Sequence, residues 1–155
     1  LSDKGSRGER EDKSGPLIAQ MLTAAGYVVE ETMILPDEAK ALKAQLIRMA
    51  DGRQVNLVLT TGGTGFSPRD ITPEATCAVA DRNAPGIAEA MRYHSLSITP
   101  RGMLSRGVSV LRGKTLIVNL PGSPKAVQEN LEYILPSLEH GVRIAAGLDG
   151  ECARK

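Results

Sequence analysis

A glycine-rich segment between a predicted strand and a predicted helix constrains this chain more than any other feature. Residues 60–74 read TTGGTGFSPRDITPE, and they follow an apolar run at residues 55–59 that predicts a buried parallel strand. Thr72 and Pro73 predict the start of a helix that Thr72 can cap. Glycines in the segment can adopt backbone dihedral angles that other residues rarely adopt, and they lack side chains that would block a ligand. The segment therefore predicts a loop that presents backbone amides to phosphate.

A carboxylate, Asp70, lies inside this predicted anion-binding loop. A carboxylate beside a phosphate is favourable when a divalent metal ion sits between them. A purely structural interpretation fits equally well, because such turns are common and an acid stabilises a helix start. The spacing excludes two known phosphate-binding motifs. No Gly-Lys-Ser/Thr follows, as a Walker loop requires, and the third glycine is misplaced for a dinucleotide fingerprint.

The composition is that of an ordinary globular protein and argues against several other classes. The 155 residues suit one domain, and we expect residues 1–155 to form a single unit. A net charge of +1 and 3% aromatic residues argue against nucleic acid as a partner. We find no apolar run long enough to span a bilayer and no visible signal peptide, so we expect a cytoplasmic protein without a membrane partner.

The cysteines and histidines do not indicate a metal site or a disulfide framework. Cys77 and Cys152 are far apart, and we expect Cys77 to be a small buried residue. His94 and His140 have no neighbour at ligand spacing, so we interpret both as structural or surface residues.

Hydrophobic periodicity and turn residues predict alternating strands and helices. The predicted helices are residues 14–25, 36–50 and 74–80, one from Pro85, one from Pro124 that Pro136 ends, and residues 137–146. The predicted strands are residues 27–35, 55–59, 107–112 and 114–120, the last two joined as a hairpin at Gly113. Residues 4–13 predict a mobile loop, and Leu1 to Asp3 resemble the tail of a strand whose earlier residues are absent. This order predicts an α/β fold: a three-layer α-β-α sandwich with a mostly parallel sheet and a late β-hairpin.

A second acid, Asp37, follows the strand predicted at residues 27–35, as Asp70 follows the next strand. Ligands collect at the carboxyl ends of strands in open α/β sheets, so the two acids could share a metal ion. The alternative is that Asp37 only stabilises the first turn of a helix. Another strand-to-helix turn, LPGSP at residues 120–124, offers Ser123 as a helix cap.

Five motifs resemble those of one enzyme family in order and spacing. They are Ser2-Asp3, DKSGP at residues 12–16, Pro36-Asp37, the segment 60–74 and LPGSP. Together they resemble the molybdopterin adenylyltransferase family of molybdenum cofactor biosynthesis, which includes the G-domains of gephyrin and its relatives. The resemblance covers the whole chain apart from a first strand. It implies a homotrimer that binds molybdopterin and MgATP, transfers AMP to the terminal phosphate of molybdopterin and releases pyrophosphate. The product would pass to a molybdate-inserting protein.

The resemblance also implies roles for particular residues. Asp37 and Asp70 would be the catalytic acids and would hold Mg²⁺. The nucleotide would be bound by Thr61, Gly62, Gly63, Thr64, Gly65, Pro121, Gly122 and Ser123. Molybdopterin would be bound by Ser2, Asp3, Asp12, Ser14 and Arg106. An ionised phosphate needs no strong general base to attack ATP, which explains why no histidine or cysteine nucleophile is required.

Three alternatives stay open at this point. The chain could be a catalytically silent member of the family, or a pterin-binding or scaffolding module such as the gephyrin relatives suggest. It could also be the related domain of nicotinamide mononucleotide deamidase-type proteins, whose central loop lacks the combination with LPGSP. The residues leave molybdenum and tungsten equally open as the metal finally installed.

Overall fold

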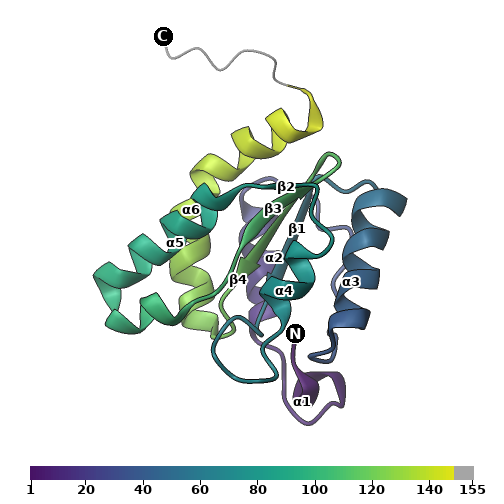
Figure 1. The fold of residues 1–155 in the computed structure, drawn as a ribbon. Helices are drawn as coiled ribbons and strands as arrows, with labels where there is room; N and C mark the ends of the chain where they lie inside the picture. The colour runs from purple at the N-terminus through teal and green to yellow at the C-terminus, as the bar shows by residue number, and fades with distance from the viewer. Residues whose placement is uncertain (149–155) are drawn as a thin grey trace.

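The computed structural model describes residues 1–148, and a four-stranded sheet forms its centre (Figure 1). The strands are β1 (Leu57–Thr61), β2 (Arg82–Asn83), β3 (Ser109–Arg112) and β4 (Thr115–Leu120), in the order β1-β4-β3-β2. β1 runs parallel to β4, with Thr61 opposite Leu120, so the loops that follow these two strands leave the same edge of the sheet. The predicted hairpin of β3 and β4 is confirmed.

Helices cover both faces of the sheet, which confirms the three-layer α/β class. The helices are α1 (Asp3–Ser6), α2 (Ser14–Ala24), α3 (Ala39–Ile47), α4 (Thr72–Cys77), α5 (Pro85–Ile98) and α6 (Pro124–Ala146), with a π-helical turn η1 (Arg48–Gly52) and a 3₁₀ turn η2 (Pro100–Leu104). Leu116 and Val118 of β4 pack in the core with α2, α5 and α6, whereas Ile117 packs with α3 and α4. This alternation is the period of two of a strand buried on both faces. Within residues 1–148, the helices are too short or too polar to cross a membrane.

The strand predicted at residues 27–35 is wrong, because these residues join no sheet in the described part of the chain. The first residues of the chain lie between this segment and β1. The Leu1 amino group donates to Thr61 O at 2.6 Å, and Ser2 N donates to Leu35 O at 3.0 Å. A strand needs an adjacent edge to pair its backbone groups, and a cavity lies between this segment and β1 instead. The described sheet therefore has one parallel and two antiparallel pairs instead of being mostly parallel.

Helix α6 also corrects the prediction, because it continues through Pro136 instead of ending there. A proline inside a helix removes one backbone hydrogen bond and crowds the preceding turn. The helix tolerates this because one long face is buried on both sides of the proline, including Leu131, Ile134 and Leu138. Tertiary packing of that face outweighs the local effect of the proline.

The predictions for the cysteines and for His94 have different outcomes. Cys77 is exposed rather than buried, because it ends the short helix α4, whose buried face carries Ala75 and Thr76. His94 stacks on Tyr133 with ring centroids 4.2 Å apart, as expected of a structural residue. Cys152 lies outside the described residues.

Candidate active site

The glycine-rich loop after β1 has a backbone that only glycine adopts easily. Gly62 and Gly63 have φ angles of +89° and +65°. Thr72 fixes this conformation, because its hydroxyl donates to Gly62 O at 2.9 Å and its amide donates to Gly63 O at 3.1 Å. The Thr72 side chain therefore ties the loop to the start of α4 rather than capping that helix, which corrects the prediction.

The two predicted catalytic acids both lie against this loop. A Cβ atom added to Gly63 would lie 3.4 Å from Asp37 Oδ1, and one added to Gly65 would lie 2.8 Å from Asp70 Oδ2. Asp70 Oδ2 accepts a hydrogen bond from the amide of Ser67 at 3.1 Å. Within residues 1–148, Oδ1 of Asp37 and Oδ1 of Asp70 accept no protein hydrogen bond. Each acid thus has one carboxylate oxygen left for a ligand.

The turn after β4 packs directly on the glycine-rich loop. The hydroxyl of Thr61 donates to Pro121 O at 2.6 Å. A Cβ added to Gly122 would lie 3.3 Å from the Cα of Gly62. The two loops therefore approach through glycine positions, which leaves backbone rather than side chains at their junction.

Helix α2 begins at the same edge of the sheet. The side chain of Asp12 binds its first turn, because Oδ1 of Asp12 accepts hydrogen bonds from the amides of Ser14 and Gly15, each at 3.0 Å. The Ser14 hydroxyl donates to Gly122 O at 2.9 Å and so joins α2 to the turn after β4. Ser123 caps α6 as predicted. Two helix N-termini therefore border the two loops.

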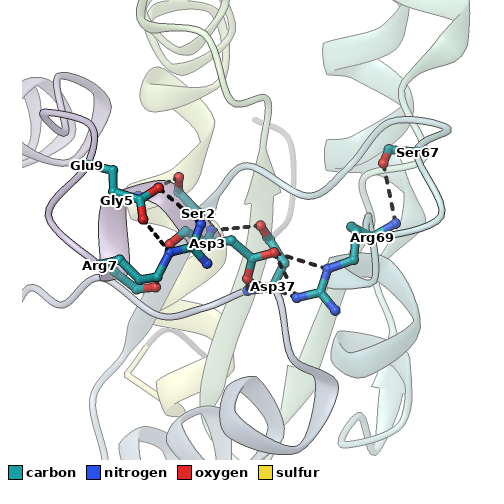
Figure 2. Close-up of polar contacts among 9 residues, drawn as sticks. Ser2, Asp3, Gly5, Arg7, Glu9, Asp37, Ser67 and Arg69 are labelled. Atoms are coloured by element: carbon teal, nitrogen blue, oxygen red, sulfur yellow. Dashed lines mark hydrogen bonds and ion pairs between the residues drawn. The ribbon is translucent and has the colours of Figure 1, made fainter.

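Asp3, Asp37 and Arg69 form a hydrogen-bonded cluster beside the glycine-rich loop (Figure 2). Asp3 N donates to Asp37 Oδ2 at 3.0 Å, and Asp37 N donates to Asp3 Oδ1 at 2.9 Å. Arg69 donates to both oxygens of Asp3, from Nε at 3.0 Å and from Nη2 at 2.9 Å. The backbone amide of Asp37, followed by Arg69, holds the pKa of Asp3 below its ordinary value.

Arg106 supports the glycine-rich loop instead of facing the cavity with a free guanidinium. Its Nε donates to Gly65 O and its Nη2 donates to Asp70 O, each at 2.7 Å, and its backbone amide donates to Thr64 O at 2.9 Å. It also pairs with Glu74, which lowers the pKa of that carboxyl group. Arg106 thus fixes the path of the loop around Asp70.

Most of the predicted site residues line one cavity of about 1170 Å³. Those lining it are Ser2, Asp12, Ser14, Asp37, Thr61, Gly62, Gly63, Asp70, Gly122 and Ser123. The remaining predicted residues, Asp3, Thr64, Gly65, Pro121 and Arg106, are not part of its lining. Among the described residues, no three His, Cys, Asp or Glu side chains gather as a ready metal cage.

Comparison with known proteins identifies the family of this chain. Residues 1–140 match the family model described as "Probable molybdopterin binding domain". The chain belongs to this family.

The molybdopterin adenylyltransferase of Escherichia coli K12 is 46% identical over 136 residues, which are 86% of this chain and 70% of that protein. The structure of the molybdopterin biosynthesis enzyme MoaB from Thermus thermophilus matches with a TM-score of 0.89 and 48% identity, covering 94% of this chain and 92% of the other. Gephyrin of Dictyostelium discoideum is 40% identical over 91% of this chain but only 21% of gephyrin. The predicted family is therefore confirmed.

Two residues of the site were not assigned from the sequence. Arg69 stands beside Asp70 in the glycine-rich segment, but it pairs with Asp3, 66 positions away, and no local pattern signals that contact. Asn119 is 1% exposed and bonds to Thr60 and Thr76 beside the loop. A polar residue inside the apolar run 116–120 was the signal that could have identified it.

Proposed function

We propose that this protein transfers AMP from ATP to the terminal phosphate of molybdopterin and releases pyrophosphate, a step of molybdenum cofactor biosynthesis. One observation carries the proposal: Asp37 and Asp70 contact the same glycine-rich loop and line the same cavity. The names of the relatives support the same activity.

The reaction joins two anions, so the site must reduce repulsion and hold the reacting groups in line. An ionised phosphate oxygen of molybdopterin attacks the α-phosphorus of ATP. The bond from that phosphorus to the oxygen bridging to the β-phosphate breaks, and pyrophosphate leaves with the electron pair. The attacking oxygen is already deprotonated, so Asp37 and Asp70 are not needed as general bases.

The donor set at the acids fits Mg²⁺. Magnesium prefers oxygen ligands and is usually held by one or two carboxylates together with phosphates and water. Asp37 and Asp70 each keep one carboxylate oxygen without a protein hydrogen bond within residues 1–148. When bound, Mg²⁺ would supply positive charge that offsets the phosphates and the charge of pyrophosphate as it leaves.

The loops divide the binding of the two substrates. We assign the nucleotide phosphates to the loop from Thr61 to Gly65 and the turn from Pro121 to Ser123, because their glycines expose backbone. We assign molybdopterin to Ser2 and Asp3 beside Asp37 and to Asp12 and Ser14 at the start of α2. Arg106 would assist by holding the loop, since its guanidinium already bonds to Gly65 and Asp70.

The remaining expectations belong to this proposal. We propose a cytoplasmic homotrimer that passes its adenylylated product to a molybdate-inserting protein. Apolar side chains exposed on α5, η2 and α6 offer a surface for a second copy of the chain. They are Tyr93, Leu96, Ile98, Met103, Leu104 and Tyr133.

The deciding experiment is incubation of the protein with molybdopterin, ATP and Mg²⁺, followed by measurement of pyrophosphate and adenylylated pterin. The expected result is equal release of both products, dependent on Mg²⁺. Binding of molybdopterin without pyrophosphate would instead favour a pterin-binding or scaffolding module. The similarity to gephyrin is the observation that favours this second function.

A further inference from the structure

We propose that Arg69 is a positioning residue that holds Asp37 in place through Asp3. The inference rests on the proposed function for its consequence in catalysis, but its geometric part stands without it. Arg69 does not contact Asp37 in any hydrogen bond of the described residues; it acts on the carboxylate that receives the Asp37 amide.

The first step of the argument is connectivity. Asp3 and Asp37 exchange two hydrogen bonds, each backbone amide donating to the other's carboxylate. Arg69 then grips both oxygens of Asp3 and precedes Asp70 directly in the chain. Asp3 therefore links the two loops that carry the predicted catalytic acids, and Figure 2 shows its carboxylate between Asp37 and the Arg69 guanidinium.

The second step is charge. The two carboxylates of Asp3 and Asp37 lie close enough for each to reach the other's backbone, so their like charges repel. The guanidinium of Arg69 balances Asp3 with a bidentate contact, a geometry that a lysine cannot reproduce. Without Arg69, only the weaker effect of Arg7 would balance the charge of Asp3, which would then push Asp37 away from Gly63 and oppose the binding of phosphate.

The third step separates positioning from simple stabilisation. The Arg69 side chain is 59% exposed, and exposed ion pairs contribute little to folding stability. A second exposed pair, Arg7 with Glu9 in the segment after α1, has side chains 58% and 50% exposed. Arg7 acts on Asp3 only through its charge at a distance and makes no hydrogen bond to Asp3, Asp37 or Asp70. Loss of either pair should leave stability nearly unchanged, and the Arg69 pair should have much the larger effect on the site.

The test measures binding of ATP at increasing Mg²⁺ by calorimetry, together with kcat and KM. Arg69→Gln is expected to raise the Mg²⁺ concentration for half-maximal binding by about 10-fold, the usual scale for residues that orient ligands. Arg69→Lys should recover part of the loss. Asp3→Asn combined with Arg69→Gln should bind better than Arg69→Gln alone, because asparagine keeps an acceptor for the Asp37 amide without the charge. Arg7→Gln, which removes a positive charge that acts on Asp3 without a hydrogen bond to it, is the matched control and should change binding much less than Arg69→Gln.

A second readout needs no nucleotide: the hydrogen exchange rate of the Asp37 amide. Arg69→Gln should speed this exchange several-fold, and Arg7→Gln should not. Unchanged exchange and unchanged Mg²⁺ dependence in Arg69→Gln would overturn the inference, as would an equal effect of Arg7→Gln. If the parent protein neither binds MgATP nor makes product, the proposed function fails, and the exchange rate alone decides the role of Arg69.

Discussion

Asn119 and Thr60 are joined across β4 and β1 by a hydrogen bond of 3.0 Å from the Asn119 amide to the Thr60 hydroxyl. The same amide nitrogen donates to the hydroxyl of Thr76 in α4 at 3.0 Å, and the Asn119 oxygen accepts from Val108 N at 3.2 Å. Asn119 is 1% exposed, so this network is shielded from water. It holds the end of β1, from which the glycine-rich loop departs, to the helix that follows the loop.

We predict that Asn119→Ala destabilises the protein by about 2–3 kcal/mol, because buried hydroxyl and amide groups lose their partners. Urea unfolding would measure the change, with Asn83→Ala at an exposed position of β2 as the control. A loss for Asn119→Ala no larger than for the control would show that the network is unimportant for stability.

Gly63→Ala should damage the loop more than a positive φ angle alone explains. A Cβ at Gly63 would collide with the Thr72 hydroxyl, whereas Gly8 has φ +72° and no atom within 4 Å of an added Cβ. Gly8→Ala should cost roughly 1–2 kcal/mol from backbone strain, and Gly63→Ala at least about 1 kcal/mol more from overpacking. Thermal unfolding of both variants tests this. Equal losses would mean that the loop moves aside without cost.

Replacing either acid with its uncharged isostere should stop catalysis while leaving the fold intact. Asp37→Asn and Asp70→Asn are each expected to lower AMP transfer by about 100-fold or more, as typical for loss of an essential electrostatic group. Pyrophosphate release measures the effect, and circular dichroism checks folding. Asp51→Asn, which removes a carboxylate paired with Arg112 in a different ion pair, is the control. Full turnover by Asp70→Asn would remove Asp70 from the mechanism.

Acid should weaken the contact of Asp3 with Asp37 and Arg69. The folded-state pKa of Asp3 is lowered, first by the Asp37 amide and then by Arg69. Its stabilising contribution is therefore fully present above the unfolded pKa and is lost as the pH falls through the folded pKa. Urea midpoints of the parent protein and Asp3→Asn should differ by a small amount at neutral pH, because the ion pair is exposed, and should converge in acid. A difference that stays constant across this range would contradict the prediction.

The proposed trimer predicts a specific sensitivity to charge on the α5 side of the molecule. Light scattering after gel filtration should give three times the chain mass for the parent protein. Tyr93→Glu, at a side chain 76% exposed, should lower that mass by opposing an apolar contact. Val28→Glu, at 86% exposure in the segment 27–35, is the control and should remain trimeric. A parent protein of monomeric mass would refute the trimer.

Local chemistry explains why part of the site could be predicted from the sequence. The cap at Ser123 and the turn glycine Gly113 act over a few residues, so their residue types are sufficient evidence. The roles of Asp37 and Asp70 came from a resemblance that covers many positions together. Their catalytic and metal-binding roles remain predictions.

The larger errors arose where distant parts of the chain decide the outcome. Pro136 should end a helix by local rules, but a buried face extends on both sides of it. Residues 27–35 have the pattern of a strand, but strand formation requires an adjacent edge, and none is within reach among the described residues. Arg69 could not be paired with Asp3 because charge along the chain does not report which oppositely charged group folding brings near.

The amino-acid order by itself determined most of the helices, the strand before the glycine-rich loop, the hairpin at Gly113, the loop itself and the family. These depend on side-chain periodicity and on backbone freedom, which are properties of short segments. Only the tertiary structure decided which oxygens of Asp37 and Asp70 stay without a protein donor and which arginine supports the loop from Asp3. The contacts of Asp3 with Asp37 and with Arg69 join residues 34 and 66 positions apart, and their geometry exists only when the layers have packed.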